Sequence, residues 1–155
     1  MHAATPRDYF FMDLALQLAR KAAARNEVPV GAVVVDAEGI VIGKGYNRVE
    51  TTFSQVAHAE VTAIQRATKK IKNWRLEECT LYVTLQPCVM CMGLIRLSRL
   101  VRVVYGAESP LFGYHLDNEL FLRLYKKDAL EITPGVSSNE AAEILKQFFK
   151  IKRNS

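Results

Sequence analysis

Residues 80–105, TLYVTLQPCVMCMGLIRLSRLVRVVY, decide the fold of this chain. Thr80–Leu85 is rich in β-forming residues and predicts a strand, and Arg102–Tyr105 predicts another. A helix that begins near Cys88 fits between them. A strand–helix–strand unit of this length implies two parallel strands joined by a right-handed crossover.

The N-terminal segment predicts an amphipathic helix. Thr5 can cap it, with Pro6 at its first position and Asp8 three residues after the cap. Apolar residues then recur at intervals of four and predict a buried stripe made of Phe10, Leu14 and Leu18.

The remaining segments complete an α/β pattern. The apolar run from Val28 to Val35 predicts a strand that is covered on both faces. We expect the other elements as follows: a turn at 36–39, a returning strand at 40–42, a polar loop at 43–55, a helix from about His58, a helix at 117–125, a fifth strand at 129–133, and a last helix at about 138–153 with a capping box of Ser137 and Glu140. Together they predict one domain, residues 1–155, with a three-layer α/β/α sandwich around a mixed sheet of about five strands.

Composition limits where the protein works. The 155 residues carry a net charge of +5, which permits a polyanionic partner without proving one. No apolar run approaches the roughly 20 residues that a membrane span needs, and the N-terminus lacks the apolar core of a signal peptide. Three cysteines, an odd number, favour a reducing compartment over a disulfide scaffold. We therefore expect a cytoplasmic protein with no membrane partner.

Two short motifs carry the chemistry. His58-Ala59-Glu60 comes first, and Pro87-Cys88-Val89-Met90-Cys91 begins 27 residues after Glu60. One imidazole and two thiolates can hold a zinc ion and leave its fourth position open, as catalytic zinc sites do. Zinc makes hydroxide available near neutral pH, and the Glu60 carboxylate is placed to move protons. Because Cys88 and Cys91 are three residues apart, they share one helix face.

Other interpretations of the cysteines and methionines need weighing. The Cys-x-x-Cys pair could be a redox dithiol, but its sequence context does not fit one. A closed structural zinc site would need a fourth ligand, for which Cys79 and His115 are the candidates, although Cys79 is better explained as a buried core thiol. We expect Met90 and Met92 to pack beneath the helix that carries the cysteines.

Basic residues gather in three places. Arg66, Lys69, Lys70, Lys72 and Arg75 surround the end of one helix, and this cluster fits a solvated face. Arg96, Arg99 and Arg102 follow the helix that carries the cysteines. The C-terminal run, Phe148-Phe149-Lys150-Ile151-Lys152-Arg153, is more specific. Two adjacent aromatic rings cannot both face one core, so one is free to stack on a base beside cations that bind phosphate.

The sequence resembles the bacterial tRNA-specific adenosine deaminases, within the wider cytidine deaminase-like superfamily. The resemblance runs from about Asp8 to Arg153, and its specific pieces are Glu27–Ala32, Gly45–Arg48, Ala57–Glu60, Thr80–Leu85, Pro87–Cys91 and Phe148–Arg153. The zinc motif alone would fit any member of the superfamily. The pieces Val28–Ala32, Cys88–Cys91 and the Phe148-Phe149 ending favour the tRNA branch.

This resemblance implies a function. It implies zinc-dependent conversion of adenosine to inosine at the wobble position of tRNA anticodons, by a homodimer in which both subunits bind tRNA. One zinc ion per chain would be held by His58, Cys88 and Cys91, with Glu60 transferring protons. The expected substrate-binding residues are Asn47, Ala59, Phe148, Phe149, Lys150 and Arg153.

Three departures from the family bear on the substrate. Gln86 stands where the family usually has Glu, so a carboxylate has become an amide. Residues 54–56, Ser-Gln-Val, replace the family's Asp-Pro-Thr. Residues 108–115, Glu-Ser-Pro-Leu-Phe-Gly-Tyr-His, replace a loop that is rich in Gly and Ala and contains Lys. The alternatives are therefore a zinc deaminase of a free nucleobase or nucleoside of the guanine, cytosine or adenosine type, and an inert RNA-binding subunit with structural zinc.

Overall fold

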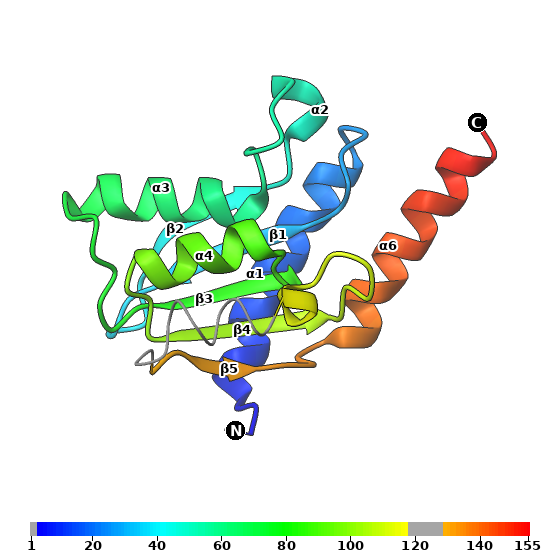
Figure 1. Cartoon of the computed structure of the whole chain (residues 1–155). Helices are drawn as coiled ribbons and strands as arrows, with labels where there is room; N and C mark the ends of the chain where they lie inside the picture. The colour runs from blue at the N-terminus through cyan, green and yellow to red at the C-terminus, as the bar shows by residue number, and fades with distance from the viewer. Residues whose placement is uncertain (1–2, 118–128) are drawn as a thin grey trace.

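One mixed sheet of five strands organises the protein (Figure 1). The structure is a computed structural model that describes residues 3–117 and 129–155. The strand order is β2-β1-β3-β4-β5. The strands are β1 (Gly31–Val35), β2 (Val41–Tyr46), β3 (Thr80–Leu85), β4 (Arg102–Ala107) and β5 (Glu131–Thr133). The prediction of a mixed sheet of about five strands is confirmed.

The crossover predicted from residues 80–105 is present. Strands β3 and β4 pair in parallel, with Thr80 opposite Arg102 and Leu85 opposite Ala107. Helix α4 (Val89–Leu97) connects them. Strand β5 extends the parallel half, whereas β1 pairs antiparallel with both β2 and β3. The sheet is therefore antiparallel at one edge and parallel at the other.

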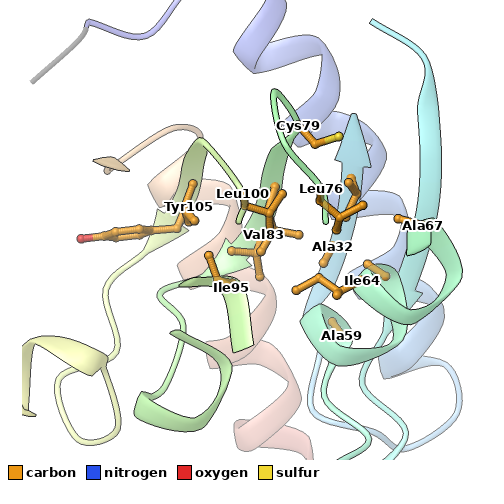
Figure 2. Close-up of a cluster of buried hydrophobic side chains, with 14 of the residues drawn as sticks. Ala32, Ala59, Ile64, Ala67, Leu76, Cys79, Val83, Ile95, Leu100 and Tyr105 are labelled. Atoms are coloured by element: carbon orange, nitrogen blue, oxygen red, sulfur yellow. The ribbon is translucent and has the colours of Figure 1, made fainter. Parts of the chain in front are cut away.

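Helices cover both faces of the sheet. Helices α3 (Ala59–Ile71) and α4 lie on one face, and α1 (Pro6–Ala23) and α6 (Ser138–Arg153) lie on the other (Figure 1). Alternate residues of β3 separate the two cores: Leu81 and Val83 face α3 and α4, whereas Tyr82 faces α1. Figure 2 shows the first of these cores, with labelled side chains such as Val83, Ile95 and Ile64. The three-layer α/β/α class is confirmed.

Two glycines let α3 approach β2 closely. A Cβ at Gly43 would overlap the carbonyl oxygen of Ala63, and one at Gly45 would overlap that of Ala59. Those carbonyls belong to the helix backbone, so no side-chain rotation could relieve the overlap. Gly45 therefore sets the position of the first turn of α3, which begins one residue after His58.

The buried face of α1 differs from the prediction. The capping box of Thr5 and Asp8 is present, but Phe10 is 60% exposed, and Leu14 and Leu18 are only partly buried. The buried stripe instead contains Phe11, Met12, Ala15, Leu16, Ala19 and Ala22. The reason is Asp8, which is itself buried and lies on the same helix face as Phe11 and Met12.

Several predicted boundaries are also wrong. Strand β1 begins at Gly31 and not at Val28, and β2 runs on to Tyr46 through the predicted loop, which also contains the short helix α2 (Val49–Thr52). The two glycines of β2 led to the prediction of a loop, because glycine is common in loops. In the fold they allow the backbone of α3 to approach the strand.

The start of α6 and the segment before β5 also differ from prediction. The capping box at Ser137 does not form, because Ser137 has φ of 56° and its side chain makes no capping hydrogen bond. Tyr114–Asp117 forms a 3-10 turn (η1), and most of the helix predicted at 117–125 lies outside the described residues. Among the described residues, no helix is both long enough and apolar enough to span a membrane.

A buried ionic network joins α1 to the sheet. Arg102 donates to both carboxylate oxygens of Asp8 over 2.8 and 2.9 Å, and the Tyr82 hydroxyl donates to the same carboxylate over 2.9 Å. Burial opposes the charge on Asp8, but the hydrogen bonds from Arg102, from the Thr5 backbone and from Tyr82 lower its pKa to about 2. Because this pKa lies below its unfolded value, the carboxylate stabilises the fold wherever it is ionised.

We expect Asp8→Asn to lower the free energy of unfolding by about 2 kcal/mol near pH 7, because charged hydrogen bonds are lost and Arg102 keeps its charge. The wild-type contribution is fully present above the unfolded pKa of 3.8 and disappears as the pH falls through about 2. The two proteins should therefore converge in stability over that range. Urea unfolding at several pH values measures this, with Asp13→Asn on the exposed face of α1 as the matched control. Equal stability of the two variants at neutral pH would contradict the account.

Candidate metal centre

Two helix N-termini bring three ligand side chains together. His58 is the N-cap residue of α3, Cys88 is the N-cap residue of α4, and Cys91 lies in the first turn of α4. Neither N-cap side chain makes a capping hydrogen bond, so both point away from their own helices' free N–H groups. Helix N-termini carry partial positive charge, which favours thiolates at these positions.

The ligand atoms fit the size of a zinc ion. His58 Nδ1 lies 3.7 Å from Cys88 Sγ and 3.4 Å from Cys91 Sγ, and all three atoms lie within 4.8 Å of one another. Bonds of about 2.3 Å to sulfur and 2.0 Å to nitrogen in a tetrahedral site place S and N ligands roughly 3.6 Å apart. The predicted set of His58, Cys88 and Cys91 is therefore brought together with suitable spacing and chemistry.

The third cysteine, His115 and the two methionines of α4 are not ligands of this cluster. Cys79 lies before β3, is buried, and donates from its thiol to the Glu77 carbonyl, so the interpretation as a core thiol is confirmed. His115 is not among the clustered ligands of the described residues. Met92 is fully buried as predicted, but Met90 is 38% exposed, because the side of α4 on which it lies is open to solvent.

The two thiols share one proton unequally. A hydrogen bond from Cys91, assisted by His58, lowers the pKa of Cys88 to about 4. The same hydrogen bond to Cys88, together with burial, raises the pKa of Cys91. The hydrogen bond with Cys88 raises the pKa of His58. Cys88 is thus a thiolate near neutral pH, and a metal that binds here would displace the protons that Cys91 and His58 retain.

Glu60 is a buried carboxyl group beside the ligands. It lies in the first turn of α3, is 4% exposed, and hydrogen-bonds with Cys91. Burial raises its pKa to about 6, although the nearby His58 opposes this shift. A carboxyl group with a pKa near neutrality can both accept and donate a proton at physiological pH.

Asn47 is fixed at the start of the segment that leads to His58. It follows β2, is buried, and donates its backbone N–H to the Val30 carbonyl. The next residue, Arg48, donates its N–H to Ala57, which ties the strand end to the residue before His58. Ala59 is buried at the first position of α3. Both predicted substrate residues therefore lie on segments joined to the ligand-bearing helix.

Sequence reasoning missed the carboxylate that holds this segment. Glu27 is fully buried and accepts hydrogen bonds from the Glu50 and Thr51 N–H groups, over 3.0 and 2.7 Å. Burial disfavours its charge, but these bonds and the Thr51 hydroxyl lower its pKa. Glu27 thereby anchors α2 to the loop before β1. A lone acid next to the apolar run Val28–Val35 was the signal in the sequence.

Gln86 connects the cysteine turn to the divergent loop. Its side-chain oxygen accepts the Ser109 N–H over 3.0 Å, and the side chain is 4% exposed. The Tyr114 N–H donates to Pro87, and Gly113 pairs with Cys88. The loop of residues 108–116 thus lies against the start of α4, with Leu111 and Phe112 about three-quarters exposed.

The C-terminal residues lie apart from the ligand layer. Helix α6 begins against β4 and extends away from the sheet, on the face opposite α3 and α4 (Figure 1). Phe148 and Phe149 pack edge to face with centroids 5.3 Å apart, and Lys152 lies over Phe148. Phe149 is 43% exposed, so one ring of the pair is accessible as predicted, and Lys150 and Arg153 are exposed.

The fold and the ligand set define a class. A five-stranded mixed sheet that presents one imidazole and two cysteines from two helix N-termini, with a buried glutamate beside them, is the arrangement of the cytidine deaminase-like zinc enzymes. In agreement with this class, residues 5–107 match the protein family described as the cytidine and deoxycytidylate deaminase zinc-binding region.

Individual relatives show to which branch of this superfamily the chain belongs. A tRNA-specific adenosine deaminase of Buchnera aphidicola is 45% identical over 148 residues, which cover 95% of this chain and 97% of that protein. A solved structure from work on tRNA:A34 deaminases is 39% identical, with a TM-score of 0.81, over 88% of this chain and 99% of that one. A solved guanine deaminase from Nitrosomonas europaea is 26% identical, with a TM-score of 0.82, over 96% and 86%. The chain belongs to the tRNA-specific adenosine deaminase family.

We expect Cys88→Ser and Cys91→Ser each to lower zinc affinity by at least about 100-fold, because a hydroxyl does not ionise to replace a thiolate ligand. Cys79→Ser is the matched control and should keep the metal, since Cys79 lies outside the cluster. Metal analysis after dialysis against a competing chelator measures the difference. Full zinc content in either ligand variant would exclude that ligand.

Proposed function

We propose that this protein hydrolyses adenosine to inosine at the wobble position of tRNA anticodons. The observation that carries the proposal is Glu60, a buried carboxyl group with a raised pKa beside three metal ligands, in a chain 45% identical to a tRNA-specific adenosine deaminase. An inert RNA-binding subunit with structural zinc would not need a buried acid at this position.

One zinc ion per chain would be held by His58, Cys88 and Cys91. When bound, zinc supplies a Lewis acid that makes water a nucleophile near neutral pH. Glu60 would perform the proton transfers: it accepts a proton from the attacking water and delivers it to the ring nitrogen. It then accepts the remaining hydroxyl proton as the carbonyl forms and delivers that proton to the amine, which leaves as ammonia. Burial, which raises the pKa of Glu60, helps this carboxyl group to hold a proton between the two transfers.

The purine is positioned by neighbouring segments. Asn47 presents an amide with both a donor and an acceptor, which suits a purine edge, and Ala59 lines the site from the start of α3. Gln86 acts indirectly, because its hydrogen bond to Ser109 holds the loop 108–116 next to Cys88. An amide makes this bond without adding a negative charge near the thiolates.

The rest of the RNA would be bound by α6. Phe149 offers an exposed ring for stacking, and Lys150 and Arg153 offer cations for phosphate. Phe148 acts by supporting the ring of Phe149, against which it packs.

We also propose a homodimer, because several large apolar side chains are exposed before or within the first turn of the ligand-bearing helices: Phe53, Val56, Val89 and Met90. Residues 1–155 would act as one deaminase domain, and a tRNA substrate implies a cytoplasmic location.

A free-base deaminase is the second candidate, because the guanine deaminase structure superposes on this chain as well as the tRNA deaminase structure does. The two candidates differ in substrate size and not in zinc chemistry. The higher sequence identity to the tRNA enzymes, 39–45% against 26%, favours RNA.

We expect the zinc-loaded protein to form inosine in a tRNA with wobble adenosine, and to leave guanine, adenine, cytosine and their nucleosides almost unchanged. Glu60→Ala should keep zinc but lose turnover by on the order of 100-fold or more, because it removes general acid–base catalysis. Nuclease digestion and chromatography of the nucleosides quantify inosine, and Glu60→Gln controls for side-chain shape.

Two outcomes would contradict the proposal. Wild-type turnover by Glu60→Ala would remove Glu60 from the mechanism. Deamination of guanine together with inactivity on tRNA would favour the free-base candidate.

A further inference from the structure

The fold unites two basic segments that the sequence separates. The C-terminal ends of α3 and α4 lie side by side, at the end of these helices opposite the ligands (Figure 1). The Leu76 N–H donates to the Ser98 carbonyl over 2.8 Å and joins the two helix ends. We call the exposed side chains gathered there the Trp74 surface: Lys69, Lys70, Lys72, Trp74, Arg75 and Arg99.

Two guanidinium groups lie over one indole ring. The Arg75 guanidinium carbon is 4.3 Å from the Trp74 ring centroid, and that of Arg99 is 5.8 Å away. Trp74 is 51% exposed although it is the sole tryptophan of the chain. Core packing does not account for this residue, because Trp74 is not part of either hydrophobic core cluster of the described residues. The ring instead acts as a surface support for two arginines.

An arginine stacked on an aromatic ring is prepared for phosphate. Stacking uses the flat face of the guanidinium and leaves its edge N–H groups directed outward, and it lowers the entropy lost on binding. Within the described residues, the Arg75 side chain has no hydrogen bond or ion pair. Arg99 donates from Nη1 alone, to the Arg96 and Leu97 carbonyls. Donors on both side chains therefore remain for a ligand.

The positive charge of the Trp74 surface favours a polyanion as its binding partner. The Trp74 surface contains five positively charged side chains, and the two carboxylates that follow in sequence are Glu77 and Glu78. A second copy of the chain is a poor occupant, because a two-fold interface would place these cations opposite one another. A nucleic-acid backbone, by contrast, supplies regularly spaced negative charge.

We propose that the Trp74 surface binds phosphates of the RNA substrate away from the target nucleotide, with Arg75 and Arg99 as the principal ligands. This inference rests on the proposed RNA substrate. Helix α3 has 13 residues, so the surface lies about 20 Å from the ligand cluster. An RNA held at both places is oriented along the ligand-bearing layer, so the surface contributes to tRNA affinity and not to the chemical step.

Trp74 itself reports on this binding. Titration of zinc-loaded protein with tRNA should change the fluorescence of the sole tryptophan, with N-acetyltryptophanamide as the control for absorption by RNA.

Arg75→Gln and Arg99→Gln should each weaken tRNA binding roughly fivefold to tenfold near 0.1 M salt, and each should reduce the slope of log affinity against log salt by about 1. KM for tRNA should rise by the same factor while kcat stays unchanged. Lys44→Gln, exposed on β2 and not one of the residues of the Trp74 surface, is the matched loss of charge.

Each outcome decides the inference separately from the proposed function. If wild-type protein makes no inosine in tRNA, the proposed function fails. If it does, but both arginine variants keep the wild-type affinity and salt slope, the inference alone is overturned. A double variant that changes the sedimentation coefficient and leaves the salt slope intact would assign the surface to a second copy and overturn the inference as well.

Discussion

The close contact between α3 and the glycines of β2 governs the site. A helix normally stands off a sheet by the length of its side chains, but Gly43 and Gly45 let the backbone of α3 lie directly against β2. A Cβ at Gly45 would also come within 2.8 Å of the Ala63 nitrogen. Since His58 directly precedes α3, the depth of this contact sets how far its imidazole reaches toward α4.

The parallel crossover supplies the other half of the site. Strand β3 ends at Leu85, and Gln86 and Pro87 turn the chain into α4, whose N-cap is Cys88. The N-terminus of α4 therefore lies at the carboxyl end of β3, where open α/β sheets generally place their sites. Helix α3 runs the same way on the same face, so both helices direct their N-termini, and hence their positive ends, to one place (Figure 1). The thiolate form is favoured at Cys88, whose pKa is lowered to about 4, and burial raises the pKa of Glu60 to about 6.

Local patterns in the sequence predicted local structure well. Strand β3 has the predicted bounds, and the ligand motif was identified from residue types and spacing alone, because Cys88 and Cys91 need only one helical turn to meet. The predictions that were wrong concern residues whose structural partners lie far away in the sequence. The buried face of α1 follows from the Asp8–Arg102 pair, 94 residues apart in sequence, and Asp8 was interpreted only as a capping residue. The glycines of β2 resembled a loop because their partner, α3, comes later in the chain. The meeting of His58 with the cysteines likewise required the fold.

The most direct test of this account is the zinc affinity of Gly45→Ala compared with Lys44→Ala. The added methyl group at Gly45 must push away the backbone of α3 at Ala59, next to His58, whereas Lys44 is exposed on the same strand. Gly45→Ala should bind zinc at least about 10-fold more weakly, because loss of the groups that support metal ligands typically weakens metal binding by that much. Lys44→Ala should bind zinc like the wild type. Equal zinc affinity in the two variants, measured by chelator competition on folded protein, would contradict the claim that this contact positions the site.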